Sequence, residues 1–426
     1  MPPTPASSRL RLVPIALAQA FGVGCGVAGV KVNSSLVPPE VLGVYGVFLT
    51  FAPIGMWVVH AGLMKFTVRH WAAAASRPAL LGVVAGAWAR RLPWLAVAAG
   101  LGAWTLAPLA TGHLLPLGGG LFAAAALLAA ATLAQTALQA EGAHWRDSVV
   151  SMTLSLTRTF LPPLLYVVTA GTLAALWGGF ALHAGLGALA GVLMLRRYWH
   201  RSADAAAAAT APVVSPTYGG PLFIALAAAG WAVAGLNRWI VAGFFGGTEA
   251  GYFTLAGGAA TVIASSLGAV FMQYFQPGIF ALADGPTPDR ARLAARVDQV
   301  ALAYGLTALA AVAVLALVAP WLVGPLIHPD YRPALPWILP AGCFGVALIT
   351  LQFYQTLLLA ARRERACGPV EFTSAVVLAA GCLAAACGGP TWFTRWLLVT
   401  PLVPWMVTRR MARAYVLRAG PSEGTS

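Results

Sequence analysis

The sequence predicts an all-α polytopic membrane protein with about twelve transmembrane helices. Of its 426 residues, 59% are hydrophobic and only 9% are charged, which is too apolar for a soluble domain of this length. Apolar runs of about 20 residues recur along the whole chain, and a helix of that length crosses the ~30 Å hydrocarbon core of a bilayer. Between these runs, lysine and arginine gather in every second connection, as membrane topology requires.

The first apolar run follows Arg9 and Arg11 and could imitate a secretory signal peptide. It continues to Val30, however, beyond a signal core of about 7–15 residues, so we expect a first transmembrane helix. Further runs follow in order, joined by connections too short for a separate domain. The predicted spans are 11–32, 41–64, 92–112, 114–139, 148–170, 172–195, 222–245, 251–275, 299–323, 335–361, 369–388 and 393–411.

The distribution of basic residues predicts that both termini are cytoplasmic. In that orientation, most of the 26 lysine and arginine residues lie on the inner side of the membrane. Lys31, Arg332 and Arg395 lie at or near the outer side, and Arg158 and Arg238 lie within predicted spans. The net charge of +14 therefore reflects membrane topology and not a nucleic-acid-binding surface.

Residues 71–88 are the ambiguous part of this topology. They are apolar apart from three residues that begin at Ser76, and they could count as an additional span. An added span would invert every later connection and place most basic residues outside. We therefore expect a separate cytoplasmic helix at the membrane interface, with Arg90 and Arg91 meeting anionic headgroups.

The chain divides into two predicted halves. Residues 1–195 hold six spans, 196–221 are expected to form a cytoplasmic linker, and 222–426 hold the other six. A short repeat supports this division, because acid, glycine and tyrosine open the second helix of each half; the matched glycines, Gly43 and Gly251, are 208 residues apart. Halves of six helices each would be parallel repeats about a pseudo-two-fold axis along the membrane normal.

Three basic residues in or near the predicted membrane helices are the candidate substrate-binding residues: Lys31, Arg158 and Arg238. A charge inside a membrane helix costs about 2.5–3.5 kcal/mol on insertion scales, so it normally faces a bundle interior or an aqueous cavity. Apart from Glu371, near the start of the 369–388 run, the predicted spans hold no Asp or Glu, and a basic, acid-poor cavity favours an anionic ligand such as a phosphate. The alternative is that each side chain caps a carbonyl, snorkels to the interface or binds a lipid headgroup.

Uncharged polar residues also occur in or beside the spans, where they can hydrogen-bond sugar hydroxyls or, more commonly, join one helix to another. They are Asn33, Asn237, Gln135, Gln139, Gln273 and Gln276. The sequence holds no P-loop, no G-x-S-x-G in a strand-turn-helix setting and no H-E-x-x-H, so we expect no enzyme and no cofactor. Its five scattered cysteines suggest neither a disulfide framework nor a metal site.

Two stretches resemble the Wzx-type polysaccharide flippases of the multidrug/oligosaccharidyl-lipid/polysaccharide exporter superfamily. They are Asn237-Arg238-Trp239-Ile240-Val241 and the run from Gly246 to Phe253. Similar support comes from Glu40 to Tyr45, from Gln139 to Gly142 and from Tyr331 to Ala334. The sequence departs from that family at Asn237, which replaces the acid of an acid-basic pair commonly found in helix seven.

The resemblance implies a flippase in the bacterial inner membrane that translocates a polyprenyl-diphosphate-linked oligosaccharide by alternating access, for O-antigen, capsule or exopolysaccharide biosynthesis. Its partners would be that lipid-linked substrate, membrane lipids and other polysaccharide-assembly proteins. Two other classes stay open. One is a cation-coupled exporter of small molecules, which needs a titratable membrane group, and the other is a membrane glycan polymerase or ligase, which would need a longer outer loop than residues 324–334.

Overall fold

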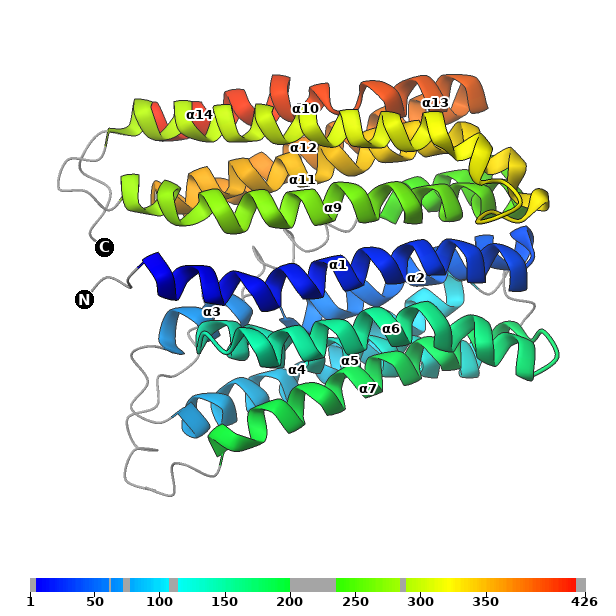
Figure 1. Cartoon of the computed structure of the whole chain (residues 1–426), viewed down its shortest axis with the longest axis horizontal. Coiled ribbons are helices and arrows are strands. Elements are labelled where there is room, and N and C mark those ends of the chain that lie inside the picture. The colour runs from blue at the N-terminus through cyan, green and yellow to red at the C-terminus, as the bar shows by residue number, and fades with distance from the viewer. Residues whose placement is uncertain are drawn as a thin grey trace. The chain divides into compact units, whose positions relative to one another are not determined.

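The computed structural model describes residues 5–60, 63–71, 77–106, 114–199, 235–283 and 289–418. Its elements are helices throughout, and the only β pairing within these residues is a single isolated bridge between Val323 and Ile327 (Figure 1). Eight of the described helices are long and apolar enough to cross a membrane. The all-α, multi-span class predicted from the sequence is therefore confirmed.

The chain forms two compact units. The first comprises residues 1–37 and 47–228, and the second comprises 38–46 and 229–426. The boundary crosses a single helix, because the first turns of α2 (Pro39–His60) cluster with the second unit. Most of the predicted linker, from residue 200 to 221, lies outside the described residues.

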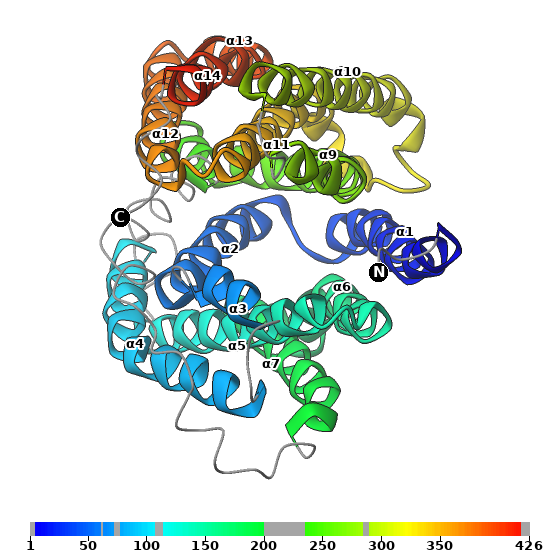
Figure 2. The ribbon, with the colours of Figure 1, turned by 90° about the vertical axis from the view of Figure 1, so that its left-hand side faces the viewer.

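The first unit is a helical bundle in which α5, α6 and α7 pack against one another, α1 packs on α6 and α4 on α5 (Figure 2). Small residues allow the close approach: a Cβ on Gly191 of α7 would lie 2.6 Å from the Cβ of Ala134 in α5. The helices are α1 (Pro5–Leu36), α2, α3 (Leu63–Trp71), α4 (Arg77–Leu106), α5 (Leu114–Ala140), α6 (His144–Val168) and α7 (Leu173–Trp199).

Helix α4 corrects one prediction from the sequence. Residues 77–88 do not form a separate interfacial helix, because they continue into 92–106 as one helix. The buried positions Leu80, Val84 and Ala87 lie on one side of α4 before the two arginines, and Leu95 and Ala99 follow, beginning about two turns after Ala87. Arg90 and Arg91 lie between these two groups of buried residues without breaking the helix, and the segment adds no further span.

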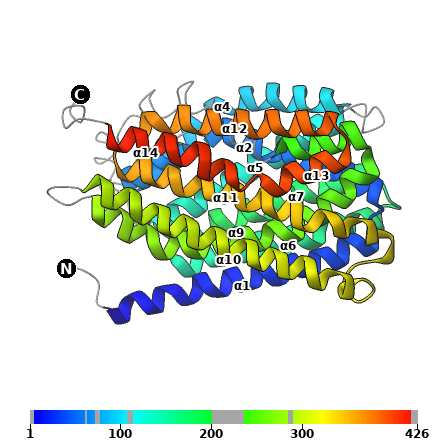
Figure 3. The same ribbon diagram turned by 90° about the horizontal axis from the view of Figure 1, so that it is seen from above.

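The second unit is built around α11, which contacts more helices of this unit than any other described element and is buried along most of its length (Figure 3). Two apolar cores lie along it, one with Phe253 and Trp337 and the other with Tyr304 and Phe353. The elements are a helix over 235–245, α9 (Gly247–Ala283), α10 (Arg290–Leu322), η3 (Pro329–Trp337), α11 (Ile338–Ala360), α12 (Glu364–Cys387), α13 (Pro390–Val399), η4 (Pro404–Thr408) and α14 (Arg409–Leu417).

Two helices of this unit are longer than predicted. Helix α9 continues to Ala283 and α10 begins at Arg290, so much of the expected 276–298 loop is helical. Asp289 caps the start of α10, since its Oδ1 accepts a hydrogen bond from the Arg292 backbone N–H at 2.9 Å. The early start places Asp298 inside a helix.

Candidate functional site

The three candidate basic residues lie in different units. Lys31, on α1, and Arg158, on α6, belong to the first unit, and Arg238, in the helix over 235–245, belongs to the second. Lys31 and Arg238 are partly buried, whereas Arg158 is exposed. The convergence of all three on one cavity stays a prediction.

Within the first unit, Lys31 and Arg158 flank the contact between α1 and α6. A Cβ on Gly29 would lie 3.4 Å from Thr159 Cγ2, and the Thr159 hydroxyl donates to the Cys25 carbonyl at 3.2 Å. Lys31 follows Gly29 by two residues, and Arg158 directly precedes Thr159. The packing of α1 on α6 thus carries both basic residues in the same region of the bundle.

In the second unit, Arg238 contacts the start of α2. Its Nη1 donates to the Gly46 carbonyl oxygen at 3.4 Å. The preceding Asn237 is buried, and its Oδ1 accepts the Arg238 backbone N–H at 2.8 Å. Asn237 is therefore a neutral amide that accepts a hydrogen bond from the backbone of the next residue.

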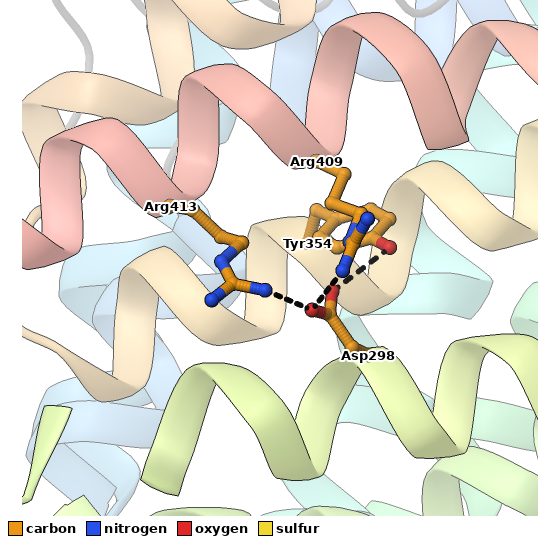
Figure 4. A network of polar contacts seen from close by, with 4 residues as sticks. All are labelled: Asp298, Tyr354, Arg409 and Arg413. Atoms are coloured by element: carbon orange, nitrogen blue, oxygen red, sulfur yellow. Dashed lines mark hydrogen bonds and ion pairs between the residues drawn. The ribbon is translucent and has the colours of Figure 1, made fainter. Parts of the chain in front are cut away.

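Asp298 is a buried carboxylate at a position that the sequence predicts to be the end of a loop. Asp298 lies on α10 and accepts contacts from two other helices, α11 and α14 (Figure 4). Its Oδ2 is 2.7 Å from Arg413 Nη1 and 3.0 Å from Arg409 Nη2, and its Oδ1 accepts the Tyr354 hydroxyl at 3.3 Å. The signal that could have revealed Asp298 was the helix cap at Asp289.

A second carboxylate, Asp147, lies in the first turn of α6. Gln139 Nε2 on α5 donates to its Oδ2 at 3.0 Å, and Gln135 Nε2 lies 3.3 Å from its Oδ1. Gln135 also donates to the Ser151 hydroxyl at 2.8 Å. Burial raises the pKa of the Asp147 carboxyl, and the two amides and the charge of His144 act in the opposite direction.

Asp147 also lies beside a contact to α1. The adjacent Ser148 is buried, and its hydroxyl donates to the Pro14 carbonyl at 2.8 Å. Three helices therefore meet around this carboxylate. Gln135 and Gln139 stand out in the sequence as polar residues beside a span, but their pairing with Asp147 depends on how α5 packs on α6.

Among the described residues, no group of three His, Cys, Asp or Glu side chains is arranged to hold a metal ion. The five cysteines are free; Cys387 is exposed and the other four are buried.

No protein-family model matches the sequence, and no curated protein matches it. Several solved structures share its fold over almost the whole chain. The MATE transporter VcmN of Vibrio cholerae has a TM-score of 0.56 at 15% identity, with 98% of each chain covered. A structure described as the inward-facing conformation of a multidrug resistance MATE family transporter of the MOP superfamily gives 0.52 at 14% identity, covering 96% of this chain and 97% of that one.

A eukaryotic MATE transporter, AtDTX14, gives a TM-score of 0.51 at 11% identity, with 96% of this chain and 97% of that chain covered. These identities are low, so the comparisons define the class of fold and no more. The chain has the two-unit helical fold of MATE transporters.

Proposed function

We propose that the protein is a membrane exporter that works by alternating access, carries small molecules and couples their export to a cation gradient. The observation that carries this proposal is the environment of Asp147. The shared fold supports it, because a similar structure belongs to a multidrug resistance transporter. Asp147 is a titratable carboxylate in the first turn of α6, directly before the predicted span 148–170, and this position supports a role in coupling.

Asp298 and Asp147 have different interaction partners, and these partners suit them to different roles. Asp298 forms ion pairs with two guanidinium groups of α14, so it belongs to a network that joins helices. The hydrogen bonds to Asp147 come from neutral amides, and burial raises its pKa, so it can change protonation at milder acidity than a free aspartate. Asp147 is therefore the carboxylate suited to coupling.

Protonation of Asp147 would alter the contact between α5 and α6. The carboxylate accepts an amide N–H at each oxygen, whereas the carboxylic acid has an O–H that must donate. Gln135 or Gln139 would then turn its amide oxygen toward Asp147, which changes the bonds that tie the two helices. Protonation of Asp147 would thus change the contact between α5 and α6. Because Ser148 is adjacent, it would also affect the contact between α6 and α1.

The test replaces Asp147 with asparagine, which cannot titrate. In proteoliposomes with an imposed proton or sodium gradient, we expect Asp147→Asn to reduce gradient-driven export of a cationic dye by about tenfold or more. Asp289→Asn is the matched control, because it makes the same chemical change at an exposed helix cap where asparagine also caps. Gradient-driven export by Asp147→Asn at the wild-type rate would contradict the proposal.

A second candidate function is the translocation of a polyprenyl-diphosphate-linked oligosaccharide across the bacterial inner membrane. Lys31, Arg158 and Arg238 favour it, because three basic residues on helices of this fold suit a diphosphate head group. In this reading they hold the head group, the lipid tail stays in the bilayer, and other polysaccharide-assembly proteins are the partners.

Arginine variants test the second candidate. We expect Arg158→Ala and Arg238→Ala to abolish surface-polysaccharide export at normal protein levels, whereas Arg332→Ala, an exposed arginine outside the candidate set, leaves export unchanged. Unchanged polysaccharide export in both variants, together with loss of dye export in Asp147→Asn, would leave only the small-molecule exporter.

A further inference from the structure

The first two turns of α2 and the start of α9 cross backbone to backbone within the second unit. A Cβ on Gly43 would collide with the Gly247 carbonyl oxygen and would lie 2.9 Å from the Gly251 amide nitrogen. A Cβ on Gly251 would collide with the Pro39 carbonyl oxygen. No other residue type fits at Gly43 or Gly251 unless the two helices move apart.

The contacts at this crossing are symmetric, because exchanging the roles of α2 and α9 gives the same set of contacts. Adding 208 to the pair Pro39 and Gly43 gives Gly247 and Gly251, so the contact of Gly43 with Gly247 matches that of Pro39 with Gly251. Residues 208 apart also meet each other directly: Glu40 Oε1 is 3.4 Å from the Thr248 hydroxyl, and Gly46 packs on Thr254. The crossing therefore has a local two-fold axis.

One polar group at the crossing is left unsatisfied. Thr254 is buried, and its hydroxyl has no hydrogen-bond partner within the described part of the chain. A buried hydroxyl without a partner is unfavourable, and separation of the helices would let water or a backbone carbonyl reach it. The tight backbone packing is thus opposed by a local penalty, so the closed and open forms are closer in free energy than the packing alone implies.

The crossing also contacts a candidate binding residue, Arg238. Gly46, which packs on Thr254, offers the carbonyl that accepts Arg238 Nη1. Movement of α2 away from α9 would carry this carbonyl with it and release that contact of the guanidinium. The position of Arg238 is therefore tied to whether the crossing is closed.

We propose that the crossing of Pro39–Gly46 with Gly247–Thr254 is a latch that opens and closes during transport and that, when closed, holds Arg238 at the Gly46 carbonyl. The proposal rests on alternating access as the proposed function. Glycine surfaces suit such a latch, because they separate without repacking any side chain, and the polar pair Glu40 and Thr248 at its edge is readily solvated.

A reversible cross-link tests whether the latch must open. Glu40→Cys and Thr248→Cys would be combined with Cys387→Ser, since the other four cysteines are buried. A short bis-methanethiosulfonate reagent bridges the two thiols, and reductant removes it. We expect dye export to stop on bridging and to return on reduction, whereas each single-cysteine variant keeps export after the same treatment. Full export by the bridged protein would overturn the latch.

A second measurement separates the latch from the proposed function. Spin labels on the same two cysteines report the distance across the crossing by electron paramagnetic resonance. We expect a short and a long population, with Gly43→Ala and Gly251→Ala shifted to the long one and Gly258→Ala unchanged, because a Cβ on Gly258 meets nothing within 4 Å. One short distance in every variant would overturn the latch, whereas two populations in a protein that exports nothing would overturn only the exporter.

Discussion

At the scale of single residues, Asp147 and Asp298 show how partners decide what a carboxylate can do. Asp298 is shared by Arg409 and Arg413, so its network carries a net positive charge and joins α10 to α14. Asp147 is held by amides on α5. The ion pairs of Asp298 stabilise one packing of the helices. Asp147 has no cation among these partners, so its charge can change without leaving a paired cation behind.

Removal of Asp298 tests its stabilising role. Asp298→Ala leaves two arginines facing each other without their shared partner, and we expect it to lower the free energy of unfolding by about 1–3 kcal/mol, less than for a fully buried pair because both guanidiniums are about a third exposed. Heating the detergent-solubilised protein and measuring the fraction that remains monodisperse gives the stability order.

The double variant Asp298→Ala, Arg413→Gln is the control for this prediction. It removes one of the two facing charges, so we expect it to recover part of the stability lost in Asp298→Ala. Equal stability of the wild type and Asp298→Ala would show that the network around Asp298 contributes nothing to the free energy of unfolding.

At the scale of elements, glycine sets how closely the helices of the second unit approach. Gly342 of α11 packs against Val312 of α10, and a Cβ there would collide with a Val312 methyl group. Gly305 of α10 is also buried, but a Cβ on it meets nothing within 4 Å. A side chain therefore has room at Gly305 but not at Gly342.

These glycines give opposite predictions for the same substitution. Gly342→Ala should destabilise the protein by about 1–3 kcal/mol through overpacking. Gly305→Ala should stabilise it by up to about 1 kcal/mol, because alanine is the better helix former. Thermal unfolding of the two variants in one detergent checks the signs, and a loss of stability at Gly305 comparable to that at Gly342 would contradict the packing argument.

Helix ends were the least predictable feature of the elements. Hydropathy reports where a helix can meet lipid, whereas the helices end where capping and packing stop them. Helices α9 and α10 therefore extend beyond their apolar runs, and α4 passes through Arg90 and Arg91. For the same reason, the sequence does not show that Asp298 is a buried charge, because its position is predicted to lie in a loop.

At the scale of the whole molecule, the class of fold could be predicted because the thickness of a bilayer fixes the length of an apolar helix. The 208-residue repeat was also visible, and its matched glycines prove to be a physical contact. Lys31, Arg158 and Arg238 stand out in the sequence because a charge in an apolar run is costly. The pairing of Asp147 with Gln135 and Gln139 could not be read from the sequence, because it depends on how α5 meets α6.

The division of α2 between the two units has a consequence for engineering. The linker is the obvious place to cut the chain into two co-expressed pieces, but such a cut leaves Pro39–Gly46 on the amino-terminal piece while the surface that it covers, at Gly247 and Gly251, lies on the other. Each fragment would then lack helix neighbours that the intact chain supplies, and their assembly would require α2 to dock on Gly247 and Gly251.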